Sequence, residues 1–151
     1  MFIAAAVYFL ARAADRNGYG FFGNVDLMFH EAGHVIFSVF GGIATVAGGT
    51  IMQLLVPLSL AAYFFRKGDR YSAGLLLLWL GQSCANVARY ADDAVALKLP
   101  LLGEGMNDWT YMFSLTSSLG KAAAVSDIFY SSGIAIIMAG IIIGILSFKN
   151  L

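Results

Sequence analysis

Long apolar runs, separated by short polar or glycine-rich turns, dominate the pattern of this chain. A helix that crosses a bilayer needs about 20 mostly apolar residues, and the clearest candidate is IFYSSGIAIIMAGIIIGILSF at 128–148. Four further runs predict helices at about 1–14, 24–40, 50–65 and 71–96. The pattern therefore predicts an all-α, polytopic membrane protein with four to five transmembrane or re-entrant helices.

Glycine, proline and polar residues mark the turns between these runs. The glycine pairs at 41–42 and 48–49 are predicted to break helices, and LPLLGEGMND at 99–108 is a predicted loop. A short helix is expected at 108–118. The length suits one domain and the chain shows no internal repeat, so we expect a single membrane domain over 1–151.

The basic residues predict an orientation in the membrane, because cytoplasmic loops are rich in lysine and arginine. The turn RKGDR at 66–70 is expected in the cytoplasm together with Arg12 and Arg16. Lys98 and Lys121 would then lie on the opposite side. This arrangement requires five alternating segments, the first of which begins at the N-terminus.

The composition supports lipid as the solvent. Charged residues make up 12% of the chain and hydrophobic residues 60%, whereas a soluble domain carries about 25% charged residues. Nine Lys and Arg balance nine Asp and Glu, so there is no basic excess to bind nucleic acid and no such partner is expected. Cys84 is the only cysteine, which excludes a disulfide within the chain.

Both histidines of the chain lie in one apolar run, LMFHEAGHVIF at 27–37. Residues four apart share a helix face, so His30 and His34 can bind one metal ion, and Glu31 can reach a water on that ion. This is the H-E-x-x-H arrangement of two zinc ligands and a general base. We expect zinc as the cofactor, His30 and His34 as ligands, and Glu31 as the catalytic residue.

The same motif is also compatible with a chance pattern or with a pigment site. Five-residue patterns of this kind arise by chance on amphipathic helices, and histidines in membrane helices also bind haem or chlorophyll. However, an ionisable residue at the centre of a membrane helix costs about 2.5–3.5 kcal/mol, so three within five positions are unexpected as filler. Two histidines on one helix face also suit a small ion better than a flat macrocycle.

The third ligand is not given by the motif, and the chain has no other histidine. Carboxylates are the candidates, with Asp108 ranked first, Asp93 second and Asp92 third, and Cys84 behind them. Asp108, in MNDWTYMF, is also at a predicted helix start, where a carboxylate can serve as a cap.

A polar stripe accompanies these carboxylates on the helix predicted at 71–96. Its members lie at offsets 0, 4, 7 and 11: Gln82, Asn86, Arg89 and Asp93. The stripe is expected to face the histidine helix, because polar side chains avoid lipid. Alternatively, Arg89 and Asp93 simply pair with each other along the helix.

Two further polar residues accompany the motif. Asp26 lies one turn before His30 and could accept a hydrogen bond from that ring, or it could cap the helix. Gln53 lies in an apolar run, where it lines the cavity or bonds to a neighbouring helix. We favour the bond, because polar residues often join helices in membranes.

These motifs resemble the site-2 protease class of intramembrane zinc metalloproteases, in particular small bacterial membrane proteins of that kind. The resemblance covers about residues 24 to 110 and rests on HEAGH, on GGTIMQLLVP and on NDW. It implies a metalloprotease-like core at about 24–118, followed by a transmembrane helix at about 128–148. It also implies a location in the bacterial inner membrane and a peptide substrate cleaved in or near the bilayer.

The alternative is a non-catalytic structural subunit of a larger membrane complex, built on a degenerate metalloprotease scaffold. The chain lacks the Asn-x-Pro and Leu-Asp-Gly elements of the protease class, and it has Asn107 where the related pattern has histidine. Gly133, Gly140 and Gly144 form one smooth helix face that would let another transmembrane helix approach closely. That helix could belong to a partner or to the protein itself.

Overall fold

The structure is a computed structural model that describes residues 1–15, 20–99 and 106–148. Within these ranges the chain is all-helical and has no strand, which confirms the predicted all-α class. The helices are α1 Phe2–Ala14, α2 Phe21–Phe37, α3 Gly42–Arg66, α4 Arg70–Asp92, α5 Asp108–Leu115 and α6 Ala122–Ser147, with short 3₁₀ helices η1 Ser38–Phe40 and η2 Leu119–Lys121.

Two of the described helices are long and apolar enough to cross a membrane. They are α3 and the continuous helical segment Leu119–Ser147, which contains η2 and α6. Helix α1 is apolar but has 13 residues, short of the roughly 20 that a span requires. Two such helices are fewer than the four to five spans expected, so the polytopic arrangement stays a prediction.

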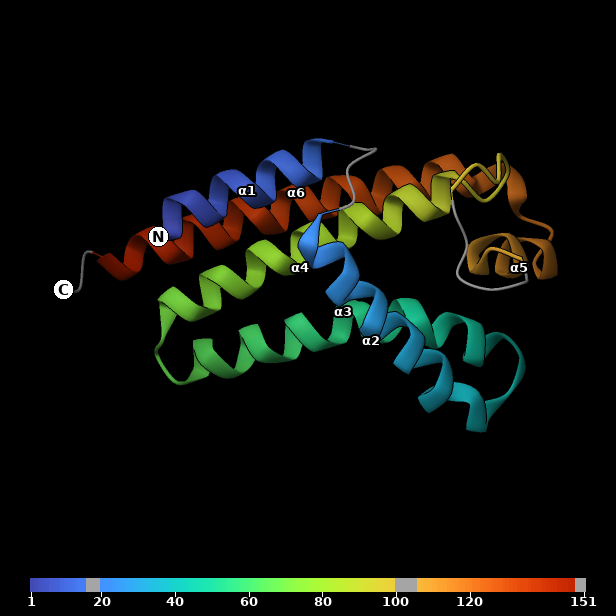
Figure 1. The fold of residues 1–151 in the computed structure, drawn as a ribbon, viewed down its shortest axis with the longest axis horizontal. Coiled ribbons are helices and arrows are strands. Elements are labelled where there is room, and N and C mark those ends of the chain that lie inside the picture. Colours follow the sequence, from blue (N-terminus) through green and yellow to red (C-terminus); the bar gives the residue numbers. More distant parts are fainter. Residues whose placement is uncertain (16–19, 100–105, 149–151) are drawn as a thin grey trace.

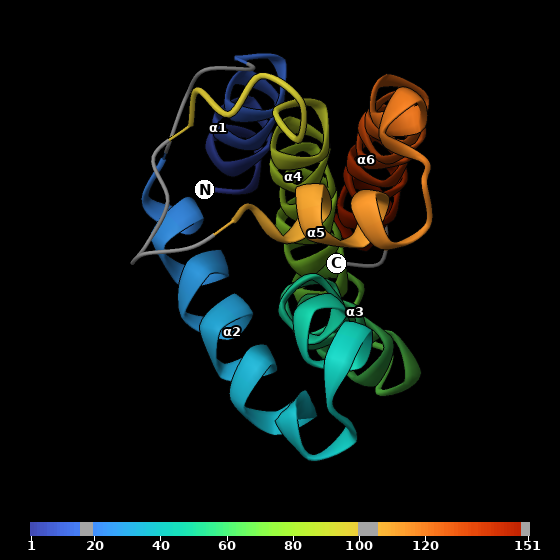
Figure 2. The ribbon, with the colours of Figure 1, turned by 90° about the vertical axis from the view of Figure 1, so that its right-hand side faces the viewer.

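Helix α4 runs through the middle of the molecule and has α6 and α3 on different sides (Figures 1 and 2). Helix α1 lies beside α4 and α6, and α2 crosses α3. The N-terminus, the turn between α3 and α4, and the C-terminal end of α6 gather at one end of the molecule (Figure 1). Helix α5 lies at the other end, where it packs on α3 and α4.

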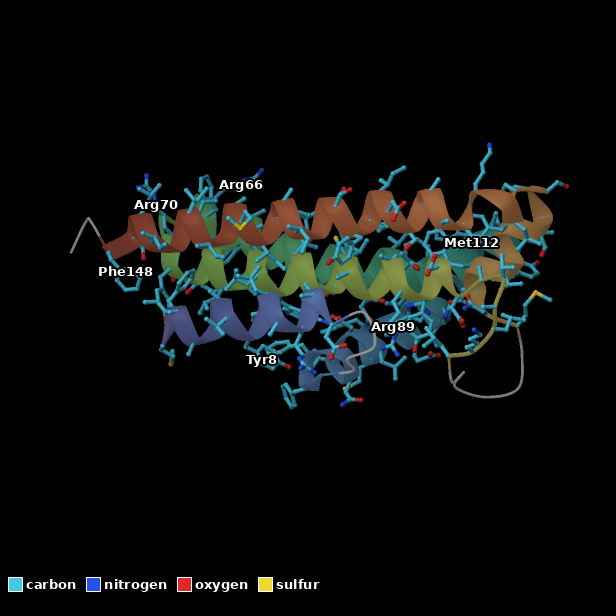
Figure 3. The ribbon with its side chains drawn as sticks, turned by 90° about the horizontal axis from the view of Figure 1, so that it is seen from above. Tyr8, Arg66, Arg70, Arg89, Met112 and Phe148 are labelled. Carbon is cyan, nitrogen blue, oxygen red and sulfur yellow. The ribbon has the colours of Figure 1, made fainter. Side chains whose placement is uncertain are left out.

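The direction of α1 differs from the sequence expectation. The ring of Phe2 lies 5.6 Å from that of Tyr71 and 6.3 Å from that of Phe148, measured between centroids. Helix α1 therefore starts at the end that carries Arg66, Arg70 and Phe148 (Figure 3), and its own Arg12 lies farther along the molecule. Contacts between aromatic side chains decide this direction, and the count of basic residues did not reveal them.

Glycines bring α4 and α6 into backbone contact. A Cβ on Gly81 would lie 2.5 Å from the carbonyl oxygen of Gly133, and one on Gly133 would lie 2.6 Å from that of Gly81. Gly74 and Gly140 meet in the same way, at 2.9 Å in each direction, and Gly144 also lies against Gly74. The glycine face of α6 is therefore covered by the protein's own helices, by α4 at Gly133 and Gly140 and by the Phe2 ring of α1 at Gly144.

Candidate metal centre

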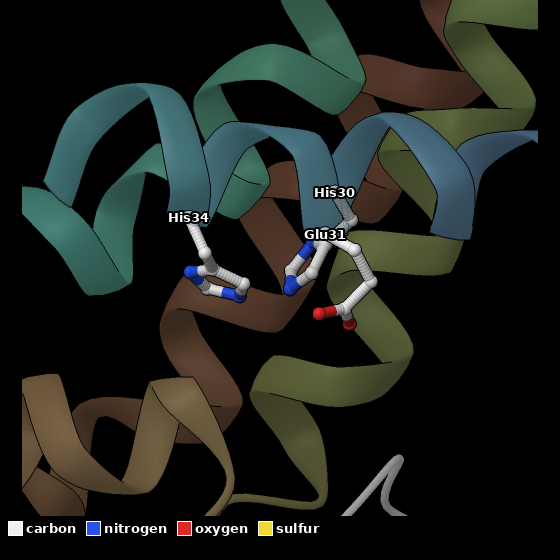
Figure 4. A group of neighbouring side chains, drawn as sticks. All are labelled: His30, Glu31 and His34. Carbon is white, nitrogen blue, oxygen red and sulfur yellow. The ribbon is translucent and has the colours of Figure 1, made fainter.

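Three side chains from two distant segments converge beside α2. The Nε2 atoms of His30 and His34 lie 2.8 Å and 3.2 Å from Oδ2 of Asp108. The two histidines lie one turn apart on α2 with ring centroids 4.8 Å apart, and Figure 4 shows both rings on the same side of the helix as Glu31. The structure thus brings together the two predicted histidine ligands and the first-ranked carboxylate.

The other ring nitrogen of each histidine faces an oxygen acceptor. Nδ1 of His34 lies 2.9 Å from the carbonyl oxygen of Thr45, and Nδ1 of His30 lies 3.2 Å from Oε1 of Gln53. A carbonyl oxygen only accepts, so Nδ1 carries the hydrogen in both rings. In a neutral imidazole the lone pair is then on Nε2, the atom that faces Asp108.

This arrangement fits a divalent cation. Two lone pairs and a carboxylate oxygen repel one another unless a positive charge, either a proton or a metal ion, lies among them. Zinc binds nitrogen and oxygen at about 2.0–2.2 Å, so neighbouring ligand atoms of a tetrahedral ion lie about 3.3 Å apart. The His34–Asp108 distance of 3.2 Å is close to that spacing, whereas the His30–Asp108 distance of 2.8 Å is that of a hydrogen bond and would lengthen by about 0.5 Å around such an ion.

Glu31 completes the local group of possible donors. One atom each from Glu31, His30 and His34 lie within 4.8 Å of one another. The carboxylate of Glu31 is exposed, and it follows His30 directly on α2 (Figure 4). It is therefore available either as a further ligand or as a base for a water molecule at the site.

Glycines of α3 make the room that this centre needs. A Cβ on Gly49 would lie 2.6 Å from Nε2 of His30, and one on Gly48 would lie 2.7 Å from the carbonyl oxygen of Gly33 on α2. The pair at 48–49 was predicted to break a helix, and that prediction was wrong. Helix α3 continues through both positions, because their missing side chains allow α2 and the His30 ring to pack against it.

Asp108 reaches the histidines because α5 is anchored at its first turn. The side chain of Asn107 accepts a hydrogen bond from the backbone N–H of Trp109 at 2.9 Å, and its amide donates to the carbonyl of Tyr90 at 3.3 Å. The hydroxyl of Thr110 donates to the carbonyl of Ala94 at 2.6 Å. These bonds hold the start of α5 against the end of α4.

The remaining ligand candidates, Asp93, Asp92 and Cys84, form no hydrogen bond or ion pair with the two histidines within the described residues. Asp93 is buried and accepts backbone N–H bonds from Lys98 and Leu99 at 2.8 Å and 3.0 Å, so it closes the end of α4. It does not pair with Arg89 among the described residues. Asp92 is exposed. The buried Cys84 lies on the face of α4 that packs against α6.

The two polar residues considered beside the motif have more specific positions than the sequence suggested. Asp26 is fully buried and accepts hydrogen bonds from Nε1 of Trp79 at 2.8 Å and from the hydroxyl of Ser83 at 2.7 Å. It therefore neither caps α2 nor bonds to the ring of His30. Gln53 does bond to a neighbouring helix, through the Ser83 carbonyl on α4 at 3.5 Å, and it also contacts His30.

Comparisons with family models, with curated proteins and with solved structures found no match for this chain. The fold and the side chains of the candidate metal centre therefore carry the functional argument alone. They define an all-helical protein with two candidate membrane-spanning helices and a group of residues able to hold a metal ion.

Proposed function

We propose that this chain is a membrane-embedded metallopeptidase-like protein of the H-E-x-x-H type, with zinc as its cofactor. The observation that carries the proposal is the convergence of His30 Nε2, His34 Nε2 and Asp108 Oδ2. Both histidines bond through Nδ1 to oxygen acceptors, so a neutral ring would offer its Nε2 lone pair to an ion in place of the hydrogen bond that His30 Nε2 makes with Asp108. The three residues would hold the ion together, and this ligand set leaves a position open for water, as catalytic zinc sites do.

Glu31 is the residue of the site suited to proton transfer. A bound zinc ion supplies a Lewis acid that lowers the pKa of its water toward about 7. Glu31, exposed beside the ligands, would take the proton of that water and pass it to the leaving amine as general base and then acid. The substrate class that follows is a peptide bond in or near the membrane.

The surface of the two long helices supports the membrane setting. Only 28% of the apolar window of α3 and 22% of that of the Leu119–Ser147 segment is buried within the molecule. Large apolar side chains such as Leu55 and Leu58 on α3 and Ile142 on α6 are exposed. Contiguous apolar surface of this kind marks contact with a membrane or a partner, and we propose lipid of an inner membrane of bacterial type.

Metal content tests the proposal directly. Elemental mass spectrometry of the purified protein should find about one zinc per chain in the wild type, and none after Asp108→Ala or His34→Ala. Asp92→Ala is the matched control, because it removes an exposed carboxylate outside the centre and should keep the metal. A wild type without zinc under chelator-free conditions would refute the metal centre and favour the structural-subunit alternative.

Catalysis needs a separate test. Glu31→Gln should abolish cleavage of a transmembrane model peptide in detergent while the zinc content stays at the wild-type level. Equal cleavage rates in Glu31→Gln and the wild type would exclude Glu31 as the base. The subunit alternative has lost one of its supports, since the glycine face of α6 is covered by α4 and by Phe2 of α1.

A further inference from the structure

Three hydrogen bonds, linked through the backbone of Ser83 and of α2, form a circuit that joins three helices behind His30. Asp26 on α2 accepts from the hydroxyl of Ser83 on α4 at 2.7 Å. The carbonyl of Ser83 lies 3.5 Å from Nε2 of Gln53 on α3, and Oε1 of Gln53 lies 3.2 Å from Nδ1 of His30. Since Asp26 and His30 are one turn apart on α2, the circuit returns to the helix on which it began.

All members of the circuit behind the ring are shielded from solvent. Asp26 and Ser83 are 0% exposed and Gln53 is 5% exposed. Buried polar groups are costly unless they are bonded. The Ser83 carbonyl that faces Gln53 is held in place by the backbone of α4, and the Asp26 bond holds the hydroxyl of the same residue. Trp79 adds a second donor to Asp26 at 2.8 Å, which helps to fix the carboxylate that receives the Ser83 hydroxyl.

The Ser83 carbonyl determines the orientation of the Gln53 side-chain amide. The Ser83 carbonyl can only accept, so it takes the NH₂ group of Gln53 and leaves Oε1 facing His30. The reverse orientation would set two acceptors against each other at Ser83. An oxygen at this position needs a hydrogen on Nδ1 of His30, and in a neutral ring that hydrogen leaves the lone pair on Nε2.

We infer that Gln53 is a positioning residue for the candidate metal centre, oriented by Ser83 so that it holds His30 in the tautomer that binds metal through Nε2. The inference rests on the proposed zinc site and adds the residue that sets its geometry. The bond that a histidine makes through its second nitrogen is known to select the metal-binding nitrogen. His34 receives the same constraint from the backbone carbonyl of Thr45, which no side-chain substitution removes.

The two histidines make the experiment simple, because the chain contains no others. In protein labelled with ¹⁵N-histidine, NMR shifts of four ring nitrogens report which nitrogen of each ring carries hydrogen and which binds zinc. The test variant is Gln53→Leu, which removes the acceptor at similar volume. Thr50→Val is the matched control. It removes a buried hydroxyl one turn earlier on α3 that has no hydrogen-bond partner among the described residues.

In zinc-loaded wild type and Thr50→Val, both rings should bind the ion through Nε2. In Gln53→Leu the His30 signals should lose this single state while the His34 signals keep theirs, and zinc affinity from chelator competition should fall about 10- to 100-fold. Unchanged His34 signals show that the variant protein is folded around the site.

Two failures can be told apart. If the wild type binds no zinc, the proposed metal centre is wrong and the inference falls with it. If the wild type binds zinc but Gln53→Leu matches Thr50→Val in His30 signals and in zinc affinity, Gln53 is only a link between helices. In that case the positioning role is overturned while the metal centre stands.

Discussion

At the scale of single residues, the His30 ring can occupy its position only because Gly49 has no Cβ atom. The space beside the ring is taken by the backbone of α3, and a Cβ at Gly49 would lie 2.6 Å from Nε2 of His30 and 2.8 Å from two ring carbons. Contacts this short force one partner to move. The side chain of His30 would have to leave the position that faces Asp108.

Gly49→Ala should therefore remove zinc from the protein without removing any ligand. The methyl group displaces His30 Nε2, and a metal site tolerates errors of only about 0.5 Å in its ligands. Gly120→Ala is the control, because a Cβ there would meet no atom within 4 Å. Zinc content by elemental mass spectrometry checks the pair, and full zinc occupancy in Gly49→Ala would contradict this account of the glycine.

Asp26 gives a second prediction at this scale, on stability. Asp26→Leu leaves the Trp79 N–H and the Ser83 hydroxyl buried without an acceptor, and each orphaned group costs about 1–3 kcal/mol. Asp26→Asn keeps one acceptor oxygen and should destabilise the protein less. Tryptophan fluorescence during thermal unfolding measures the midpoints. The wild type should have the highest midpoint, Asp26→Asn a lower one and Asp26→Leu the lowest. A higher midpoint for Asp26→Leu than for Asp26→Asn would contradict the bonding pattern.

Part of the candidate centre could be predicted from residue types and spacing. His30, Glu31 and His34 were identified by the H-E-x-x-H pattern, whereas Asp108 was one of several carboxylates that the sequence barely separates. The acceptors behind the two rings could not be identified in the same way. One of these acceptors is the backbone carbonyl of Thr45, and since every residue has such a carbonyl, the sequence does not mark it. The other, Gln53, is oriented by an α3–α4 contact that a linear pattern does not contain.

At the scale of elements, the pairing of α4 with α6 rests on glycine. Gly140→Val would place branched carbons against the backbone of Gly74, where even a single Cβ would lie 2.9 Å from the carbonyl oxygen. Overpacking of this kind costs about 1–3 kcal/mol. Ala139→Val, at the exposed neighbouring position, should have little effect. The thermal midpoints of both variants in detergent provide the measurement, and equal midpoints would contradict tight packing at Gly140.

The start of α4 predicts a pH effect on stability. Asp69 caps this helix, and its hydrogen bonds with Ser72 lower the pKa of the carboxyl below its ordinary value. A lowered native pKa means that the cap stabilises the fold fully above the ordinary aspartate value and loses this effect as the pH falls through the native pKa. Asp69→Asn also caps but does not titrate, so its stability should lack this acid-induced decrease when the two proteins are compared across pH.

Element types were easier to predict than element ends. Apolar runs located every long helix, because a long run of apolar residues leaves few alternatives to a helix. The pair Gly48-Gly49 was misjudged because glycine has two uses, as a helix breaker and as a place of close helix approach. Only the partner helix, which here brings Gly33 against Gly48, distinguishes the two.

At the scale of the whole molecule, α5 is the feature that the sequence did not place. The order of elements puts Asp108 after α4, far along the chain from the histidines, and an alternating set of spans would carry it toward the side opposite to the start of α2. In the structure α5 folds back across the end of α4 and onto α3 (Figure 2). Hydrogen bonds from Asn107 and Thr110 to the carbonyls of Tyr90 and Ala94 hold it there, and neither residue type by itself predicts such contacts.

The same arrangement predicts which segments share a side of the membrane. The C-terminal ends of α3 and α6 lie at one end of the molecule, while η1 and η2 lie at the other (Figure 1). If both long helices cross the bilayer, single cysteines at Ser38 and Lys121 should react with a membrane-impermeant thiol reagent from one side. A cysteine at Lys67 should react only from the other, which the basic turn at 66–70 predicts to be the cytoplasm.

The three positions are exposed, so the reagent can reach each of them wherever lipid does not cover it. The background for this test is Cys84→Ala, which removes the only native thiol. Labelling of Ser38 and Lys67 from the same side would show that α3 does not cross the bilayer, and its apolar surface would then need a protein partner. A fourth cysteine at Phe148, which is exposed directly after α6, tests α6 in the same way: it should react from the side of Lys67, and reaction from the side of Lys121 would show that α6 does not cross. Together the four positions test both spans, because α3 separates Ser38 from Lys67 and α6 separates Lys121 from Phe148.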